Sequence, residues 1–171
     1  LATCQNAPAN LGRRLRYILI ERSAAMRTLQ QNYLAPWVGQ TGHVTWIDRL
    51  EDLPTDSITG LFFSNELVDA FPVHRIAVID GKLQEIYVDW REDRFTEVHR
   101  PLSEELANHL REGAITLPEG YRTEVNLDAI HWMKQVAQVM TRGVVMTIDY
   151  GHTADDLYGP DRKTGTFLCY Y

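Results

Sequence analysis

Three polar residues that could bind or activate a substrate follow a short apolar run near the middle of the chain. Asn65, Glu66 and Asp69 come directly after the apolar residues 58–63, and the polar segment ends at Pro72. A short apolar run that ends in turn-forming residues predicts a strand buried on both faces of a parallel sheet. Ligands of open α/β sheets bind beyond the carboxyl ends of such strands. The competing interpretation is structural: Asn65 caps a helix, and Glu66 lies in its first turn.

A second acidic residue follows an earlier apolar run. Glu21 comes directly after residues 17–20, and Ser23 then begins a predicted helix that Pro36 ends. A carboxylate between a strand and a helix can accept hydrogen bonds from the ribose hydroxyls of a nucleotide, because a vicinal diol presents two donors to two acceptor oxygens. Acidic residues also end many strands that bind nothing, so the pattern alone leaves both interpretations open.

A third predicted strand ends in the same way. Residues 144–148 are mainly apolar and predict another buried strand, which is followed by Asp149 and Tyr150. Residues 43–47 are a further strand candidate, in which Trp46 is more often a core residue than a platform for an adenine ring. Three predicted strands therefore end in carboxylate-bearing turns, and the carboxyl ends of parallel strands lie at one edge of a sheet.

The order of these segments predicts the fold class. Strand and helix patterns alternate, which favours an α/β fold of the Rossmann-like, doubly wound type with a mainly parallel sheet. The helix with the clearest apolar stripe begins at Asn126 and is expected to end at residues 142–143. Residues 152–163 are polar and predicted to be a loop, and residues 165–168 resume a strand pattern.

The segment after Pro72 has a different pattern. Asp80-Gly81 lies between two alternating segments and is a strong hairpin signal, and residues 94–98 could add a third antiparallel strand. Ser103 is expected to cap a short helix. A meander between parallel units predicts an insertion, which we place at residues 73–100 of a single domain.

The composition limits the possible functions. The chain has 171 residues, which fits one domain, 1–171, and its net charge of −6 argues against general nucleic-acid binding. No apolar run reaches the length of about 20 residues that spans a membrane. The cysteines, Cys4 and Cys169, have no paired spacing, which favours a reducing compartment, and the histidines show no spacing typical of metal ligands, so no metal site is predicted.

The polar strand ends belong to a wider pattern that resembles the MidA-like family of S-adenosylmethionine-dependent methyltransferases. The matching segments are Glu21-x-Ser23 with Gln30, Phe63 through Val73, Glu124, Ile148 through Gly151, and Tyr158, Arg162, Gly165-Thr166 and Tyr170. The Asn-Glu-Leu-x-Asp-Ala-x-Pro and Asp-Tyr-Gly elements, in this order, are specific together. The glycine-rich loop of the family would precede Tyr17, and residues 1–16 contain no G-x-G, so we expect the chain to be a fragment of a longer domain.

The resemblance implies a class I methyltransferase fold with S-adenosylmethionine as cofactor. It places Glu21 on the cofactor ribose with Ser23 beside it, and Asn65 near the methionine moiety. Positioning is the main catalytic task in methyl transfer, because the nucleophile, the carbon and the sulfur must be aligned.

The resemblance also suggests the methyl acceptor. The family includes a mitochondrial complex I assembly factor that dimethylates a protein arginine, so the implied substrate is a protein arginine, with a respiratory-complex subunit as the implied partner. Glu66 and Asp69 are the predicted catalytic carboxylates that would hold the guanidinium, with Asp149 and Tyr150 as substrate-binding residues behind them. The implied location is the cytoplasm, or the mitochondrial matrix in a eukaryote.

Two other functions are compatible with the sequence. The methyltransferase-like fold could be a non-catalytic binding module that acts as an assembly factor, with residues 75–90 as its contact surface. A different nucleotide-dependent α/β enzyme, such as a dehydrogenase, would also place an acidic residue after the second strand. The Asn-Glu-Leu and Asp-Tyr-Gly elements do not resemble dehydrogenase motifs, so that possibility ranks last.

Overall fold

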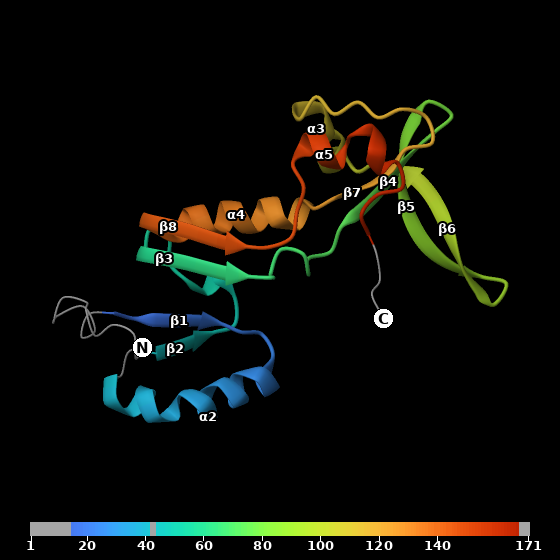
Figure 1. The fold of residues 1–171 in the computed structure, drawn as a ribbon. Coiled ribbons are helices and arrows are strands. Elements are labelled where there is room, and N and C mark those ends of the chain that lie inside the picture. The colour runs from blue at the N-terminus through green and yellow to red at the C-terminus, as the bar shows by residue number, and fades with distance from the viewer. Residues whose placement is uncertain (1–14, 42–43, 168–171) are drawn as a thin grey trace. The chain divides into compact units, whose positions relative to one another are not determined.

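The described residues form two parallel strand pairs and one antiparallel sheet (Figure 1). The computed structural model describes residues 15–41 and 44–167. The chain divides into two compact units, Leu1–Thr59 with Gln135–Arg142, and Gly60–Lys134 with Gly143–Tyr171. The predicted cysteine and amino-terminal features, and Tyr170 of the family pattern, lie outside the described residues.

The first unit contains a strand–helix–strand motif. Its elements are β1 (Tyr17–Ile20), α2 (Ala24–Thr41) and β2 (Val44–Ile47), followed by the short 3-10 helix η2 (Leu50–Asp52). β1 and β2 are parallel, with Tyr17 opposite Val44 and Ile20 opposite Ile47, as the crossover connection requires. Ser23 caps α2 as predicted, because its Oγ accepts from the N–H of Met26 at 3.3 Å.

Helix α2 corrects one prediction. Pro36 was expected to end the helix, yet α2 continues through it to Thr41. A proline within a helix removes one backbone hydrogen bond but does not oblige the chain to leave the helical conformation.

A second parallel pair joins β3 (Ile58–Asn65) to β8 (Met140–Ile148). The N–H of Ser57 donates to the carbonyl of Val139, and the N–H of Glu66 donates to the carbonyl of Ile148. Residue numbers rise together along both strands, so the pair is parallel. Both strands were predicted from the sequence, and both are confirmed.

Helix α4 (Leu127–Val139) contacts one face of this pair, where Phe62 meets the ring of Trp132 edge-on at 5.8 Å. The predicted start at Asn126 is right to one residue, but the predicted end at residues 142–143 is wrong. Met140 already belongs to β8, and the carbonyls of Gln138 and Val139 accept from the N–H groups of residues 56 and 57.

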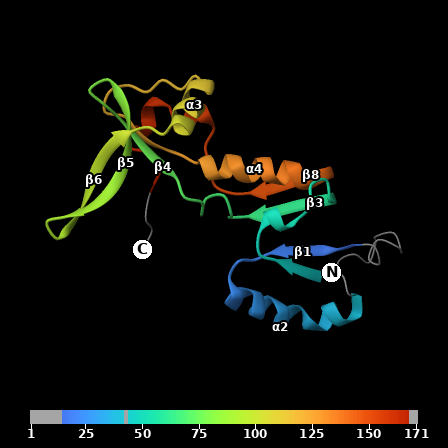
Figure 2. The same ribbon diagram turned by 180° about the vertical axis from the view of Figure 1, so that it is seen from behind.

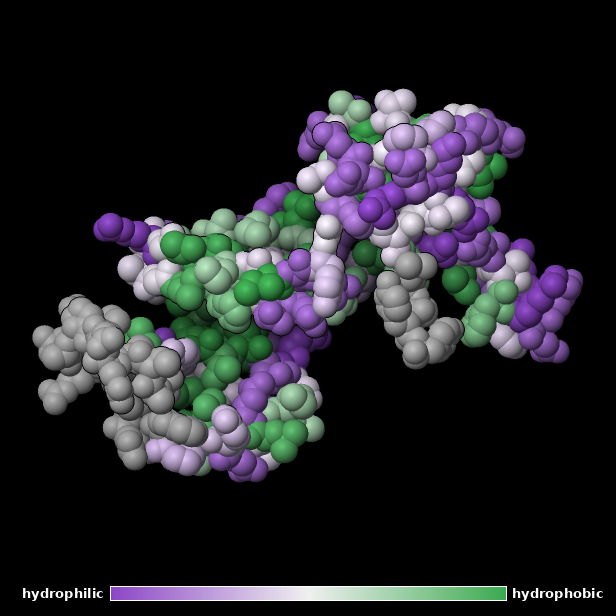
Figure 3. Space-filling view, in the orientation of Figure 1, coloured by the Kyte–Doolittle hydropathy of each residue, from purple (hydrophilic) through white to green (hydrophobic). Residues whose placement is uncertain are grey.

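The opposite face of the β3–β8 pair is exposed, so the prediction that these strands are buried on both faces is wrong. Large apolar side chains lie exposed there: Leu61, Phe63, Val144, Met146 and Ile148. Phe63 is 55% exposed, for example, and Ile148 is 52% exposed. Figure 3 shows apolar residues gathered over this region. Burial on both faces needs a second covering layer, which the described residues do not supply here.

The second unit contains a four-stranded antiparallel sheet in the order β6-β5-β4-β7. Its elements are β4 (His74–Ile79), β5 (Lys82–Arg91), β6 (Arg94–Pro101), helix α3 (Glu104–Glu112) and β7 (Arg122–Val125). Asp80 and Gly81 both have positive φ, 51° and 69°, as a type I′ hairpin turn requires. The predicted hairpin, its third strand and the Ser103 cap are therefore confirmed, whereas β7 was not predicted.

Helix α3 lies beside the antiparallel sheet (Figures 1 and 2), and buried side chains from the sheet and the helices form the core of this unit. Ile76, Leu106, Leu110, Val125 and Leu127 form one buried cluster. Ile76 and Val125 come from neighbouring strands, and Leu106 and Leu110 lie on one side of α3, four residues apart. This packing ties β7 and the start of α4 to the inserted sheet.

The last described segment differs from its prediction in two ways. The expected loop contains helix α5 (Ala154–Leu157) and the 3-10 helix η3 (Pro160–Arg162), and residues 165–167 form no strand. Tyr121 contacts this segment: its hydroxyl donates to the carbonyl of Gly159 at 2.6 Å, and the carbonyl of Leu157, at 3.1 Å, shares the same proton. A buried tyrosine more than 30 residues away in sequence thus anchors this segment.

Candidate functional site

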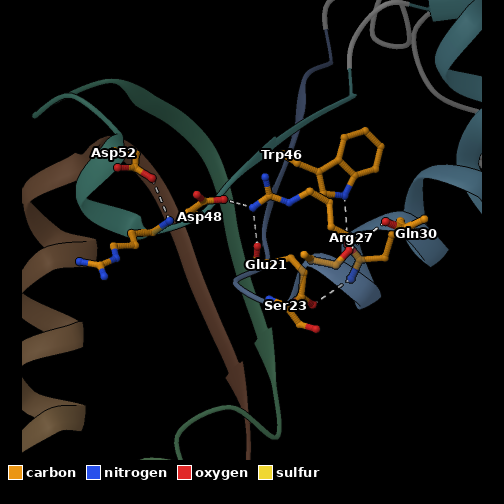
Figure 4. Close-up of polar contacts among 10 residues, drawn as sticks. Glu21, Ser23, Arg27, Gln30, Trp46, Asp48 and Asp52 are labelled. Carbon is orange, nitrogen blue, oxygen red and sulfur yellow. Dashed lines mark hydrogen bonds and ion pairs between the residues drawn. The ribbon is translucent and has the colours of Figure 1, made fainter.

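The carboxylate of Glu21 is held from two sides at the end of β1. Its Oε1 accepts from the backbone N–H of Ser23 at 2.8 Å, and its Oε2 accepts from Nε2 of Gln30 at 3.1 Å. Gln30 is held in turn, because Nε1 of Trp46 donates to its Oε1 at 2.9 Å (Figure 4). Each carboxylate oxygen can accept more than one hydrogen bond, so Glu21 retains acceptor sites for an added ligand.

Arg27 stabilises the backbone around this carboxylate. Its Nη2 donates to the carbonyl of Glu21 at 2.7 Å and pairs with the carboxylate of Asp48 (Figure 4). Asp48 follows β2 as Glu21 follows β1, so a single guanidinium joins the carboxyl ends of two adjacent strands. This ion pair is not evident from the sequence, since its two residues lie in different elements.

In the second unit, the loop after β3 wraps around the side chain of Asp149. Oδ2 of Asp149 accepts from the backbone N–H groups of Leu67, Val68 and Asp69 at 3.1, 2.7 and 3.4 Å. Consecutive N–H groups that converge on one point form an anion-binding concavity. The anion here belongs to the chain itself and comes from the end of the neighbouring strand β8.

These hydrogen bonds determine the charge of Asp149. Burial opposes the charged form, but the N–H groups of Val68, Tyr150, Asp69 and Leu67 outweigh it and lower the pKa of Asp149. Oδ1 accepts from the N–H of Tyr150 at 2.8 Å, so both carboxylate oxygens are engaged within the protein. Asp149 was predicted to bind substrate, whereas its contacts favour a role in holding the loop.

Glu66 lies at the start of this loop in an unusual backbone conformation. Its φ of 46° is in the left-handed region, which costs free energy for a residue with a side chain. Its Oε1 accepts from the hydroxyl of Tyr150 at 3.2 Å. The negative charge of Glu66 is the main cause that raises the pKa of Tyr150, so the phenol keeps its proton and remains a donor.

The helix-cap interpretation of Asn65 is wrong. No helix follows β3: the chain turns at Glu66 and reaches β4 through residues 67–73. The reason is a contact distant in sequence, since Asp149 accepts the N–H groups that a helix cap would have accepted. The side chains of Asn65 and Asp69 are exposed and make no hydrogen bond within the described part of the chain.

The structure therefore gathers the predicted residues into two groups. Glu21 and Ser23 lie together in the first unit, and the second unit brings Asn65, Glu66, Asp69, Asp149 and Tyr150 to the ends of β3 and β8. The second grouping follows from parallel pairing, which places the carboxyl ends of adjacent strands side by side.

One further carboxylate of the family pattern has a defined contact. Oε2 of Glu124 accepts from the N–H and the hydroxyl of Thr166 at 2.7 and 3.2 Å, and Glu124 is 8% exposed. Gly165 has φ +82° and lies directly against this carboxylate, where a Cβ atom would clash. The contact explains why the pattern contains a carboxylate and a Gly-Thr pair far apart in the sequence.

Neither a metal-binding cluster nor a membrane-spanning helix occurs among the described residues. Among them, no three histidine, cysteine, aspartate or glutamate side chains are grouped to hold a metal ion. No helix within residues 15–41 and 44–167 has the length and apolar character needed to cross a membrane.

Comparison with known protein families gives a match over the whole chain. A family model described as "Putative S-adenosyl-L-methionine-dependent methyltransferase" matches residues 1–171. The chain belongs to this family. The predicted resemblance to the MidA-like methyltransferases is thereby confirmed, and family membership assigns S-adenosylmethionine as the cofactor.

Individual relatives agree with the family. The Drosophila melanogaster protein arginine methyltransferase NDUFAF7 homolog, mitochondrial, is 29% identical over 135 residues, which are 73% of this chain and 28% of that relative. Two Burkholderia thailandensis crystal structures, one of them bound to S-adenosyl-homocysteine, are 28% and 29% identical with a TM-score of 0.74 each. They match 88% of this chain, which spans 38% and 40% of theirs. The α/β fold, with parallel and antiparallel sheets, is therefore shared with this family.

Proposed function

We propose that this chain is part of an S-adenosylmethionine-dependent methyltransferase that modifies an arginine side chain of a protein. The observation that supports the acceptor is the loop after β3. It holds the carboxylates of Glu66 and Asp69 at an exposed strand end, with its backbone fixed by Asp149. A guanidinium is planar and permanently charged, and carboxylates bind it through paired hydrogen bonds.

The residues around Glu21 fit the cofactor. The carboxylate is oriented by Ser23 and Gln30 and keeps acceptor capacity, as a ribose diol requires. Asn65, exposed at the end of β3, is the proposed contact for the amino acid portion of the cofactor. When bound, S-adenosylmethionine supplies an electrophilic methyl group on a sulfonium.

The side chains of the protein would orient the substrate guanidinium and offset its positive charge. Glu66 and Asp69 would hold the guanidinium, and the hydrogen bond from Tyr150 keeps one Glu66 oxygen in place. Arginine remains protonated up to a pKa of about 12 or above, so acidic side chains that offset its charge favour its approach. Loss of the proton follows methyl transfer, and no strong general base is needed.

Neutralising the two loop carboxylates tests this role. In the full-length gene product, Glu66→Gln and Asp69→Asn are each expected to lower kcat/KM for an arginine-containing acceptor by about tenfold to a hundredfold, since each removes a charged hydrogen-bond partner. The measurement is transfer of a labelled methyl group from S-adenosylmethionine.

A matched control is available at the β5–β6 turn. Glu92→Gln with Asp93→Asn removes two exposed negative charges at a different turn of the same unit and should leave turnover unchanged. Wild-type turnover in the double variant Glu66→Gln, Asp69→Asn would remove both carboxylates from the mechanism.

The chain of contacts behind Glu21 provides a separate test of cofactor binding. Trp46→Phe keeps an aromatic ring but removes the N–H that orients Gln30. We expect the Kd for S-adenosyl-homocysteine to rise about fivefold, which corresponds to loss of about 1 kcal/mol. Trp90→Phe, at an exposed position of the second unit, is the control. Calorimetric titration measures the Kd of both variants. An unchanged Kd for Trp46→Phe would show that cofactor binding does not depend on the hydrogen bond from Trp46 to Gln30.

Several wider features belong to the same proposal. We propose a doubly wound, class I methyltransferase arrangement over residues 1–171 as a single domain, with residues 73–100 as an inserted β-hairpin region. The protein substrate would be a subunit of a respiratory complex, as the family resemblance implies, and the Drosophila relative, a mitochondrial protein arginine methyltransferase homolog, supports a protein arginine as acceptor. The location would be the cytoplasm, or the mitochondrial matrix in a eukaryote.

A second candidate function is a binding module that assists assembly of a protein complex. The observation that favours it lies on the arm formed by β5 and β6, where Val88, Trp90 and Phe95 are 63%, 58% and 78% exposed. Trp90 and Phe95 are directly opposite and share one face of the ribbon with Val88. Calorimetry on the full-length protein separates the two functions, because absence of binding at millimolar S-adenosylmethionine would favour the binding module.

A further inference from the structure

The side chain of Asn126 contacts two parts of the second unit at once. Its Oδ1 accepts from the N–H of Ala129 at 2.8 Å, which caps helix α4. Its Nδ2 donates to the carbonyl of Val68 at 3.1 Å, in the loop after β3. The amide thus uses its acceptor for the helix and its donor for the loop.

This donor complements the contact made by Asp149. Asp149 binds the N–H groups of Leu67, Val68 and Asp69, whereas Asn126 binds the carbonyl of Val68. The peptide groups on both sides of the Val68 Cα atom are therefore held: Asp149 binds an N–H of each, and Asn126 binds the carbonyl of the second. A third backbone contact, from the N–H of Phe71 to the carbonyl of Val68 at 3.2 Å, closes the turn.

We propose that Asn126 is a positioning residue for the candidate acceptor site, which holds the loop that carries Glu66 and Asp69. Glu66 has a left-handed backbone conformation, and such a conformation persists only where surrounding contacts determine it. Asn126 supplies one of these contacts from outside the strand pair. Its effect on turnover rests on the proposed function, whereas its effect on the loop does not.

The two chemical roles of the amide can be separated by substitution. Asn126→Ser retains an oxygen that can cap α4 but is too short to reach Val68. Asn126→Asp retains the cap and places a carboxylate oxygen against the Val68 carbonyl, where the two acceptors repel. Ser103→Ala is the matched control. It removes the Oγ atom that accepts from the N–H of Leu106 at 3.2 Å and caps α3, and Ser103 does not contact the loop after β3.

The decisive readout is amide hydrogen exchange in the full-length protein, measured residue by residue. We expect the amides of Leu67, Val68 and Asp69 to exchange about tenfold faster in both Asn126 variants, while Ala129 exchanges as in the wild type. Ser103→Ala should leave the loop amides unchanged. Loop amides that exchange at the wild-type rate in both Asn126 variants would overturn the proposal.

Steady-state methyl transfer supplies the second readout. A positioning role predicts that kcat falls about tenfold in Asn126→Asp while the KM for S-adenosylmethionine is unchanged. A loosened loop with wild-type kcat would also overturn the proposal. If the wild-type protein methylates no arginine acceptor, the proposed function fails, and the exchange rates alone then decide whether Asn126 holds the loop.

Discussion

Asp149→Ala is expected to abolish the ordered structure of the loop after β3 and to lower methyl transfer about a hundredfold. The substitution leaves the N–H groups of Leu67, Val68 and Asp69 without their shared acceptor. Loss of hydrogen bonds to a charged group, discounted for the partial exposure of the loop, corresponds to about 2 kcal/mol of unfolding free energy. Denaturant unfolding measures this loss, and labelled methyl transfer measures the effect on turnover.

Asp149→Asn is the informative comparison. An asparagine keeps one oxygen for the loop but turns an NH2 group toward the N–H of Tyr150, so an intermediate loss is expected. Wild-type loop exchange rates and turnover in both variants would show that another contact determines the loop.

The same carboxylate gives a defined pH dependence. Burial raises the pKa of Asp149 in the folded protein, but the N–H groups that bind the carboxylate lower it by more, so the net shift is downward. Its contribution to stability is therefore complete above the unfolded pKa of about 3.9 and is lost as the pH falls through the lower folded value. The stability difference between wild type and Asp149→Asn should accordingly be constant near neutral pH and shrink below about pH 4.

Gly165→Ala is expected to destabilise the second unit by about 3 kcal/mol. Part of this loss is the positive φ of +82°, which costs a residue with a Cβ atom about 1 kcal/mol or more. The remainder comes from the Glu124 carboxylate, whose Cδ atom would lie 2.9 Å from the new Cβ, so that Glu124 must leave its bonds to Thr166. Thermal or denaturant unfolding measures the change.

Gly120→Ala provides the control for Gly165→Ala. Its φ of +76° is nearly the same, but nothing lies within 4 Å of the position that a Cβ atom would occupy. It should therefore show the backbone cost alone. Equal losses in the two variants would show that Glu124 adjusts without cost, and introducing Gly165→Ala into a Glu124→Ala background should reduce its effect to that of Gly120→Ala.

The sequence predicted most elements that position the site, because local patterns determine them. The apolar runs before Glu21, Glu66 and Asp149 are strands, and Asp80-Gly81 forms the expected hairpin turn. Ser103 caps α3, as its residue type and position suggest. These features depend on residues that are neighbours in the chain.

The contacts within the site could not be predicted in this way. The loop after β3 is not a helix because Asp149, about 80 residues later, accepts its N–H groups. Asn126 was recognised as a helix start, but nothing local indicates that its other amide atom binds Val68. Such contacts depend on which strands pair, and the resemblance to a family identified the residues without identifying their partners.

The place where the antiparallel sheet joins the rest of its unit has an evolutionary consequence. His74, the first residue of β4, and Val125, the last residue of β7, lie directly opposite each other on adjacent strands. The two ends of the segment between them are therefore adjacent. A segment with adjacent ends can be lengthened, shortened or replaced without changing the backbone conformation of the rest of the domain. The antiparallel sheet can therefore change in length without displacing the contact between Asn126 and Val68, which lies just outside it.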